Sequence, residues 1–275
     1  AIEAVGDEVP PVDGKDVQLS IDSKVQFFAY QKLRDAVVAH KAKAGSVVVL
    51  DAVSGEILAL ANYPSYKPDN RAKLTGSQLR NIALTDTFEP GSTMKPVTAA
   101  IALEAGRVTP NTIINVSPGR YQLDRFTIRD THNYGSLTVE GVIQKSSNVG
   151  ALKIAQKLSA HEMWDAFTAL GYGQKPQVPF PGAAMGRLRP WKAWRPVEQA
   201  TMSYGYGLSA SLFQMAHSYT AFSADGKVLP ASLLKLDQPS EGQQVFSPKT
   251  AAEIRKMLQM AAGPGGTGQR AQTVG

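Results

Sequence analysis

Phe88–Pro96 reads FEPGSTMKP. Its Pro-Gly pair is typical of a turn, and the residues after it are typical of the start of a helix. The Pro-Gly pair interrupts regular structure, and the second proline falls in the first helical turn, where its missing N–H costs little. An apolar stripe continues the helix until Gly106, a residue type that often ends helices. Residues three apart on a helix share one face. The sequence therefore predicts that the side chains of Ser92 and Lys95 touch.

A serine beside a lysine is suited to acyl transfer. A serine hydroxyl is a poor nucleophile until a neighbouring base takes its proton. A lysine acts as that base when it is neutral, and both burial and the positive pole of a helix N-terminus lower a lysine pKa. The same pole places the Ser92 backbone N–H where an oxyanion forms. We therefore predict that Ser92 is a nucleophile and that Lys95 is its base.

The Ser-x-x-Lys spacing alone is not specific, because about one copy is expected by chance in a chain of this length. A second copy, Ser232 to Lys235, lies between Pro230 and Pro239 in a stretch typical of a strand or loop. Only the first copy opens a helix behind a Pro-Gly break. We predict that the second copy has no catalytic role.

A second motif, Ser146-Ser147-Asn148, lies between two stretches predicted as helices, residues 138–145 and 149–158. A hydroxyl at Ser146 is suited to relay a proton between the nucleophile, the base and a leaving amine. The Asn148 amide both donates and accepts hydrogen bonds, which suits the binding of a peptide backbone. A helix cap or kink is the alternative interpretation of this motif when it is taken alone.

Four stretches, taken whole, are far more specific than the short patterns. They are FEPGSTMKP at 88–96, QKSSNVG at 144–150, QATMSYGYGL at 199–208 and VVVLDAVSGEILALANYP at 47–64. Through them the chain resembles the transpeptidase domain of class B penicillin-binding proteins, of the division-specific type called FtsI or penicillin-binding protein 3. The resemblance covers nearly the whole chain.

The resemblance implies a role for six residues. Ser92 corresponds to the acylated nucleophile, Lys95 to its base and Ser146 to the proton-shuttling serine. Asn148 corresponds to the amide that holds the substrate or drug side chain. Tyr204 and Tyr206 correspond to substrate-binding aromatic residues near the cleft wall, and ordinary packing of two aromatic rings is an equally open interpretation.

One expected motif is missing from the chain. The resembled family carries Lys-Thr-Gly or Lys-Ser-Gly on a strand beside the nucleophile, and no such tripeptide occurs here. Lys249-Thr250-Ala251 follows a Ser-Pro helix start and belongs to a helix predicted to run to about Ala262. The tail 263–275 resembles the loop before the missing strand, and the chain does not begin with Met. We therefore expect a piece of a longer protein, incomplete at its C-terminus and by itself inactive.

Composition fits a folded enzyme domain and excludes several other classes. Hydrophobic residues make up 43% and charged residues 19%, which is normal for a globular protein. The net charge is +6 with a pI near 9.4, but the cationic residues are scattered, so we expect no nucleic-acid partner. Work close to an anionic membrane or wall and a simple solubility effect both fit this charge.

The side chains that would hold a metal are also missing or dispersed. The absence of cysteine excludes disulfides, thiol catalysis and cysteine metal sites. The four histidines are far apart and form no metal-binding pattern, so we expect no metal and no organic cofactor. No apolar run reaches the length of a membrane helix. The resemblance implies a membrane anchor upstream of Ala1.

The predicted architecture is α+β. A helix at 24–43, capped by Asp22 or Ser23, precedes a hairpin at 46–50 and 56–61, and residues 62–87 are mostly loop with short helix. Further helices are predicted at 160–170, 209–224 and 247–262. The resemblance implies the penicillin-recognising serine transpeptidase fold, an antiparallel sheet with packed helices and a mainly helical subdomain, whose last strands lie beyond Gly275. It assigns 1–20 to the end of an N-terminal pedestal region and 21–275 to the transpeptidase domain.

The function that follows is a peptidoglycan D,D-transpeptidase of septal cell-wall synthesis, which is also a target of β-lactams. The resemblance implies stem peptides ending in D-Ala-D-Ala as substrates, and division proteins such as a cognate glycosyltransferase as partners. It implies an inner-membrane location at the septum, with the catalytic domain in the periplasm. The alternatives are a D,D-carboxypeptidase, a β-lactam-sensing domain and an inactive fragment. A class A β-lactamase fits less well, because it has Ser-Asp-Asn in the second motif and needs a deacylating Glu.

Overall fold

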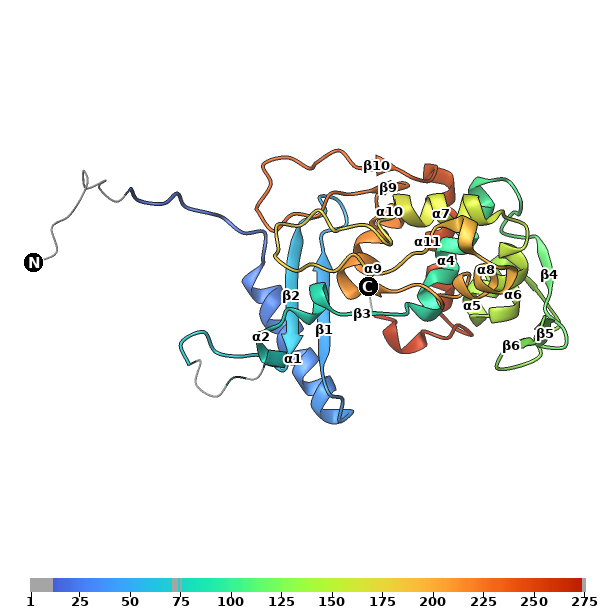
Figure 1. Cartoon of the computed structure of the whole chain (residues 1–275), viewed down its shortest axis with the longest axis horizontal. Coiled ribbons are helices and arrows are strands. Elements are labelled where there is room, and N and C mark those ends of the chain that lie inside the picture. The colour runs from blue at the N-terminus through green and yellow to red at the C-terminus, as the bar shows by residue number, and fades with distance from the viewer. Residues whose placement is uncertain (1–11, 71–73, 75, 274–275) are drawn as a thin grey trace, which may run out of the picture.

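Figure 1 shows the computed structural model, which describes residues 12–70, 74 and 76–273. A β-hairpin with one long helix against it forms one side of the molecule, and a larger, mainly helical part forms the other. This arrangement of helices and strands confirms the predicted α+β class. Of the predicted N-terminal segment 1–20, residues 1–11 lie outside the described part of the chain, and the boundary at residue 20 stays a prediction.

The hairpin side is built from α1 (Ser23–Ala39), β1 (Gly45–Leu50) and β2 (Ile57–Tyr63). The Asp22 carboxylate accepts the backbone N–H groups of residues 24 and 25, so it caps α1 as predicted. The helix packs on the hairpin through Leu33 and Val37, which are both buried. The strands β1 and β2 pair antiparallel, and because successive side chains of a strand point to opposite faces, they place alternate side chains toward α1 and toward the helical part.

The helix prediction for 24–43 was wrong at its C-terminal end, because α1 stops at Ala39. Lys41 takes a left-handed conformation with φ of 51°. The N–H of Ala42 then donates to the carbonyl of Val37 at 3.0 Å, which closes the last turn. The helical spacing of the apolar residues, on which the prediction rested, does not indicate this turn.

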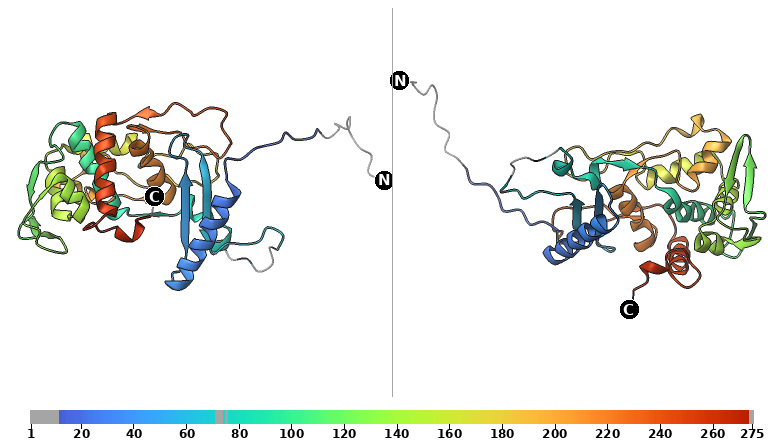
Figure 2. Two further views of the ribbon diagram at one scale, coloured as in Figure 1. Left: turned by 180° about the vertical axis from the view of Figure 1, so that it is seen from behind. Right: turned by 90° about the horizontal axis from the view of Figure 1, so that it is seen from below.

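The helical part contains α4 at its centre. Every residue of α4 from Lys95 to Ala102 is buried, including the polar Lys95 and Thr98, so the core surrounds this helix on all sides. Figure 2, left, shows the molecule from behind, and there α11 (red) lies in front of this part, where it packs on α4 and α5. The helices of this part are α4 (Lys95–Glu104), α5 (Val139–Lys145), α6 (Asn148–Ala155), α7 (Ala160–Ala169), α8 (Pro196–Met202), α9 (Leu212–Ser218), α10 (Thr220–Ser223) and α11 (Pro248–Ala262). Two short helices, α2 (Gly76–Leu79) and α3 (Ile82–Thr85), lie between the hairpin and α4.

Short strand pairs complete the fold, and all of them are antiparallel. The predicted helix 209–224 was wrong at its start, where Ala210–Ser211 forms β8 against β3 (Thr87–Phe88). The remainder divides into α9 and α10. The other pairs are β4 (Ile113–Asn115) with β7 (Ser136–Thr138), β5 (Arg120–Leu123) with β6 (Phe126–Arg129), and β9 (Lys227–Val228) with β10 (Gln243–Gln244). Among the described residues, no helix combines the length and apolar character that a membrane span requires.

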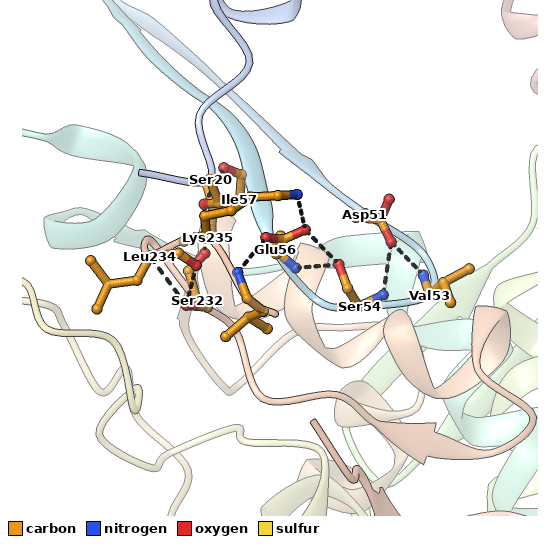
Figure 3. Close-up of polar contacts among 10 residues, drawn as sticks. Ser20, Asp51, Val53, Ser54, Glu56, Ile57, Ser232, Leu234 and Lys235 are labelled. Carbon is orange, nitrogen blue, oxygen red and sulfur yellow. Dashed lines mark hydrogen bonds and ion pairs between the residues drawn. The ribbon is translucent and has the colours of Figure 1, made fainter. Parts of the chain in front are cut away.

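A buried carboxylate ties distant segments to the turn of the hairpin (Figure 3). Glu56 is 5% exposed and accepts the backbone N–H of Leu236 at 2.8 Å and the Lys235 ammonium at 3.0 Å. These two donors, in that order, lower the pKa of Glu56. Ser20 adds a hydrogen bond from its hydroxyl to the carbonyl of Ser232 at 2.9 Å. The network fixes the segment around residues 232–236 to the hairpin.

Candidate active site

The predicted serine–lysine contact is present. Gly91, with φ of 63°, opens a 3₁₀ turn, Gly91–Met94, and α4 follows directly from it. In a 3₁₀ turn residues i and i+3 lie above one another, so Ser92 and Lys95 still meet although the α-helix starts later than predicted. The Lys95 Nζ lies 3.0 Å from the Ser92 Oγ. Ser92 is exposed, whereas Lys95 is only 2% exposed.

Burial of Lys95 changes its acid–base behaviour. Loss of solvent lowers the pKa of Lys95 to about 8, and the negative charge of Asp130 opposes part of that shift. At pH 7 about one lysine in ten is then neutral, compared with far fewer for a solvent-exposed lysine. Nζ also contacts the Ser146 Oγ at 2.9 Å and its carbonyl oxygen at 2.5 Å. A neutral amine donates two N–H groups to these oxygens and keeps its lone pair for the Ser92 hydroxyl.

The contact with Ser146 depends on an uncommon backbone conformation. Ser146 follows the last turn of α5 with φ of 55° and ψ of 43°, in the left-handed region. This conformation costs roughly 1–2 kcal/mol for a residue other than glycine, and such strain is found mostly where function requires it. Its hydroxyl and carbonyl both meet Lys95, so the strained turn joins the second motif to the first.

Ser147 has a different environment from Ser146. It is 1% exposed, and its Oγ donates to the Asp130 Oδ2 at 2.6 Å and accepts the N–H of Gly150 at 2.8 Å. It is therefore the N-cap of α6. Ser147 thus caps a helix, which was the alternative interpretation of the motif, whereas Ser146 contacts the predicted base, Lys95.

These environments predict different effects for two alanine substitutions. Ser146→Ala removes a hydroxyl that contacts the base, and acylation by a labelled penicillin should slow by about 10²–10⁴-fold. Ser147→Ala removes a cap and should cost about 1 kcal/mol of stability with a much smaller change in rate. A time course of labelling and a thermal unfolding curve of the intact protein measure both effects. If Ser147→Ala slows acylation more than Ser146→Ala, the assignment of the two serines is wrong.

Asp130 is a site residue that the sequence analysis missed. Besides Ser147, its carboxylate accepts the backbone N–H groups of Asn148 at 2.6 Å and Val149 at 3.0 Å. It thereby fixes the start of α6, and its charge also acts on Lys95. Asp130 follows β6 and stands 17 residues before Ser147, and no local pattern connects the two. The only signal was an acidic residue directly after a short alternating stretch.

Asn148 and the two tyrosines lie on segments that border the serine turn. The Asn148 Nδ2 donates to the Arg129 carbonyl at 2.9 Å, which holds its amide beside β6. Tyr204 is buried in the core and Tyr206 is 50% exposed, with their ring centroids 5.8 Å apart. Packing therefore accounts for Tyr204, and only Tyr206 presents a large exposed surface. Roles in substrate binding stay a prediction for all three residues.

The loop between the tyrosines contacts the turn directly. The N–H of Gly91 donates to the Gly205 carbonyl at 3.0 Å. A Cβ on Gly205 would lie 2.0 Å from the carbonyl oxygen of Gly91, so only glycine permits this approach. A further contact was not foreseen from the sequence, namely the Tyr219 hydroxyl, which donates to the Thr93 carbonyl at 2.7 Å. The Ser92 turn is therefore held from two sides.

The second Ser-x-x-Lys copy forms no comparable pair. The Ser232 hydroxyl donates to the Leu234 carbonyl at 2.7 Å, whereas the Lys235 ammonium is paired with Glu56. Both side chains belong to the network of Figure 3. Their contacts are those of a structural turn, as the sequence context predicted.

Comparisons with known proteins show the family to which this chain is similar. The family model described as the penicillin binding protein transpeptidase domain matches residues 45–275. The chain is 48% identical over 258 residues to a probable peptidoglycan D,D-transpeptidase PenA of Neisseria meningitidis, covering 94% of this chain and 44% of that protein. It is 37% identical over 257 residues to the peptidoglycan D,D-transpeptidase FtsI of Escherichia coli K12, covering 94% and 43%. The chain thus spans less than half the length of these relatives.

Solved structures give the same result for the fold. The apo structure of the TP domain from Burkholderia pseudomallei penicillin-binding protein 3 superposes with a TM-score of 0.87 at 50% identity, over 95% of this chain and 75% of that one. A Burkholderia ambifaria protein described as a peptidoglycan glycosyltransferase superposes with a TM-score of 0.86 at 53% identity, over 93% and 77%. The predicted fold and the resemblance stated from the sequence are both confirmed.

Proposed function

Because this chain belongs to the penicillin-binding protein transpeptidase domain family, we propose that it carries the acylation centre of a peptidoglycan D,D-transpeptidase. One observation supports this most strongly. The Lys95 Nζ lies 3.0 Å from the Ser92 Oγ and 2.9 Å from the Ser146 Oγ. An exposed serine beside a buried lysine of lowered pKa is the arrangement that serine acyl transfer needs.

In the proposed reaction, neutral Lys95 accepts the proton of the Ser92 hydroxyl, and the Ser92 oxygen attacks the carbonyl between two terminal D-alanines. Ser92 lies in the first turn of a helical segment, so its N–H has no intrahelical acceptor and is free to stabilise the oxyanion. The proton returns through Ser146 to the departing amine, and D-alanine leaves. The amine of a second peptide then attacks the acyl-enzyme, which forms the cross-link and restores the Ser92 hydroxyl. A β-lactam acylates the same oxygen when its ring opens.

We also propose a cellular setting for this reaction, namely cell division. The similarity to a protein named FtsI supports a role in cell division. We place the domain in the periplasm, at the septum, in a protein anchored in the inner membrane and working with division proteins such as a glycosyltransferase. Substrate binding by Asn148 and Tyr206 belongs to the same proposal.

Product analysis tests the function. The intact protein is incubated with a peptide ending in D-Ala-D-Ala and with a peptide carrying a free acceptor amine, and the products are separated by mass. We expect a cross-linked peptide and an equal amount of free D-alanine, and neither product with Ser92→Ala. Release of D-alanine with a hydrolysed peptide and no cross-link would show a carboxypeptidase instead.

A further inference from the structure

We infer that Arg120 and Arg129, which face each other across the β5–β6 hairpin, form a subsite for a carboxylate on the peptide substrate. The inference rests on the proposed function, since it names a second feature that the peptide at this site would carry. The carboxylate in question is several residues away from the carbonyl that Ser92 attacks, and it stays on the acyl-enzyme after D-alanine leaves.

The first support is the pairing in the hairpin. Arg120 is the cross-strand partner of Arg129, and both side chains are exposed. The next pair on the same face, Gln122 and Thr127, is neutral and joined by a hydrogen bond of 2.6 Å. Like charges directly opposite each other destabilise an antiparallel pair. The position of the two arginines is therefore unfavourable unless an anion lies between them.

The second support is the absence of a counter-ion in the described part of the chain, where no carboxylate forms an ion pair with Arg120 or Arg129. Asp130 is adjacent in sequence, but its carboxylate is already bound by the Ser147 hydroxyl and by two backbone N–H groups at the start of α6. The pair is thus left with two positive charges open to solvent.

The third support is location. The carbonyl of Arg129 accepts the Asn148 Nδ2 at 2.9 Å, and Asn148 stands two residues after Ser146, which contacts Lys95. Figure 1 shows β5 and β6 beside α6 at the end of the helical part farthest from the hairpin side. An extended peptide spans about 3.3–3.6 Å per residue. We therefore place the arginine pair within reach of a peptide of several residues acylated on Ser92.

The residue type indicates the ligand. The guanidinium group is planar and always charged, and its N–H groups match the two oxygens of a carboxylate. Two guanidinium groups on neighbouring strands are able to bind one carboxylate from both sides. The third arginine of the hairpin, Arg125, lies near the turn with its guanidinium 5.3 Å from the ring centroid of Phe126. Arg125→Gln therefore offers a control that removes one positive charge from the same hairpin without touching the pair.

The test compares two peptides and three forms of the intact protein. The peptides end in D-Ala-D-Ala and differ in one side chain upstream, which carries a carboxylate in one and a carboxamide in the other. The proteins are the wild type, the double variant Arg120→Gln with Arg129→Gln, and Arg125→Gln. The release of D-alanine gives kcat and KM for each combination. Thermal unfolding shows whether each variant is folded.

We expect the wild type to prefer the carboxylate peptide and the double variant to lose that preference. Its kcat/KM for the carboxylate peptide should fall about 10–100-fold, mainly through KM, as for the loss of charge-assisted hydrogen bonds. The carboxamide peptide should be processed equally by both proteins, and Arg125→Gln should keep the preference. The loss should shrink at high salt, because screening weakens exposed charges.

Two results would overturn the inference. One is equal kcat/KM for both peptides with the wild type. The other is the same loss in Arg125→Gln as in the double variant, which would indicate a general effect of net charge or binding of a different anion. Failure of the proposed function gives a different result. In that case neither the wild type nor the two variants would release D-alanine from either peptide, and the inference of a substrate subsite would be wrong as well.

Discussion

Ser92→Ala should abolish covalent labelling of the intact protein by a fluorescent penicillin. The Ser92 oxygen is the atom proposed to open the β-lactam ring, and no other hydroxyl in the described structure contacts Lys95 except that of Ser146. Ser92 is exposed and removal of its hydroxyl leaves no cavity, so the unfolding temperature should stay nearly unchanged. Gel fluorescence after incubation with the penicillin measures the label.

The matched control is Ser232→Ala, the serine of the second Ser-x-x-Lys copy. Its hydroxyl serves a local turn, so this variant should be labelled at the wild-type rate. Labelling that persists in Ser92→Ala, or that disappears in Ser232→Ala, would contradict the assignment of the nucleophile.

Lys95→Met should slow acylation by about 10²–10⁴-fold, because it removes the general base from beside an intact nucleophile. Methionine is also unbranched and fills much of the buried volume of the lysine stem. Lys153→Met removes the same charge from the surface of α6, where the ammonium donates to the Asn115 carbonyl and lies 5.6 Å from the ring centroid of Tyr121. That control should acylate as fast as the wild type in the same time course.

The pH dependence gives an independent test of Lys95. A lysine acts as a base only in its neutral form, which dominates above its pKa of about 8. The acylation rate constant of the wild type should therefore rise with pH up to about 8 and then level off. Lys95→Met should lose this rise. A wild-type rate that stays flat or falls over this range would show that Lys95 does not act as the base.

The parts that the sequence predicted correctly depend on local patterns. The serine–lysine spacing placed Ser92 and Lys95 in contact for either an α or a 3₁₀ turn, since both bring residues three apart together. The cap Asp22 marks the start of α1 through its own side chain. These features need no knowledge of distant residues, so the sequence was sufficient for them.

The parts that were missed depend on distant contacts. Asp130 enters the site only because the chain brings it to the start of α6. The break in the helix predicted at 209–224 arises because Ala210 and Ser211 pair with β3, far earlier in the chain. The arginine pair follows from the register in which β5 and β6 pair. Tertiary contacts decide each of these, and a local pattern does not contain them.

The central claim is that Ser92 is the acylated residue, and the site of the covalent bond tests it most directly. The intact wild-type protein is reacted with a penicillin and digested, and the modified peptide is sequenced by mass spectrometry. We predict one adduct, with the mass of the opened penicillin, on Ser92. An adduct on Ser146, Ser147 or Ser232 in place of Ser92 would contradict the claim.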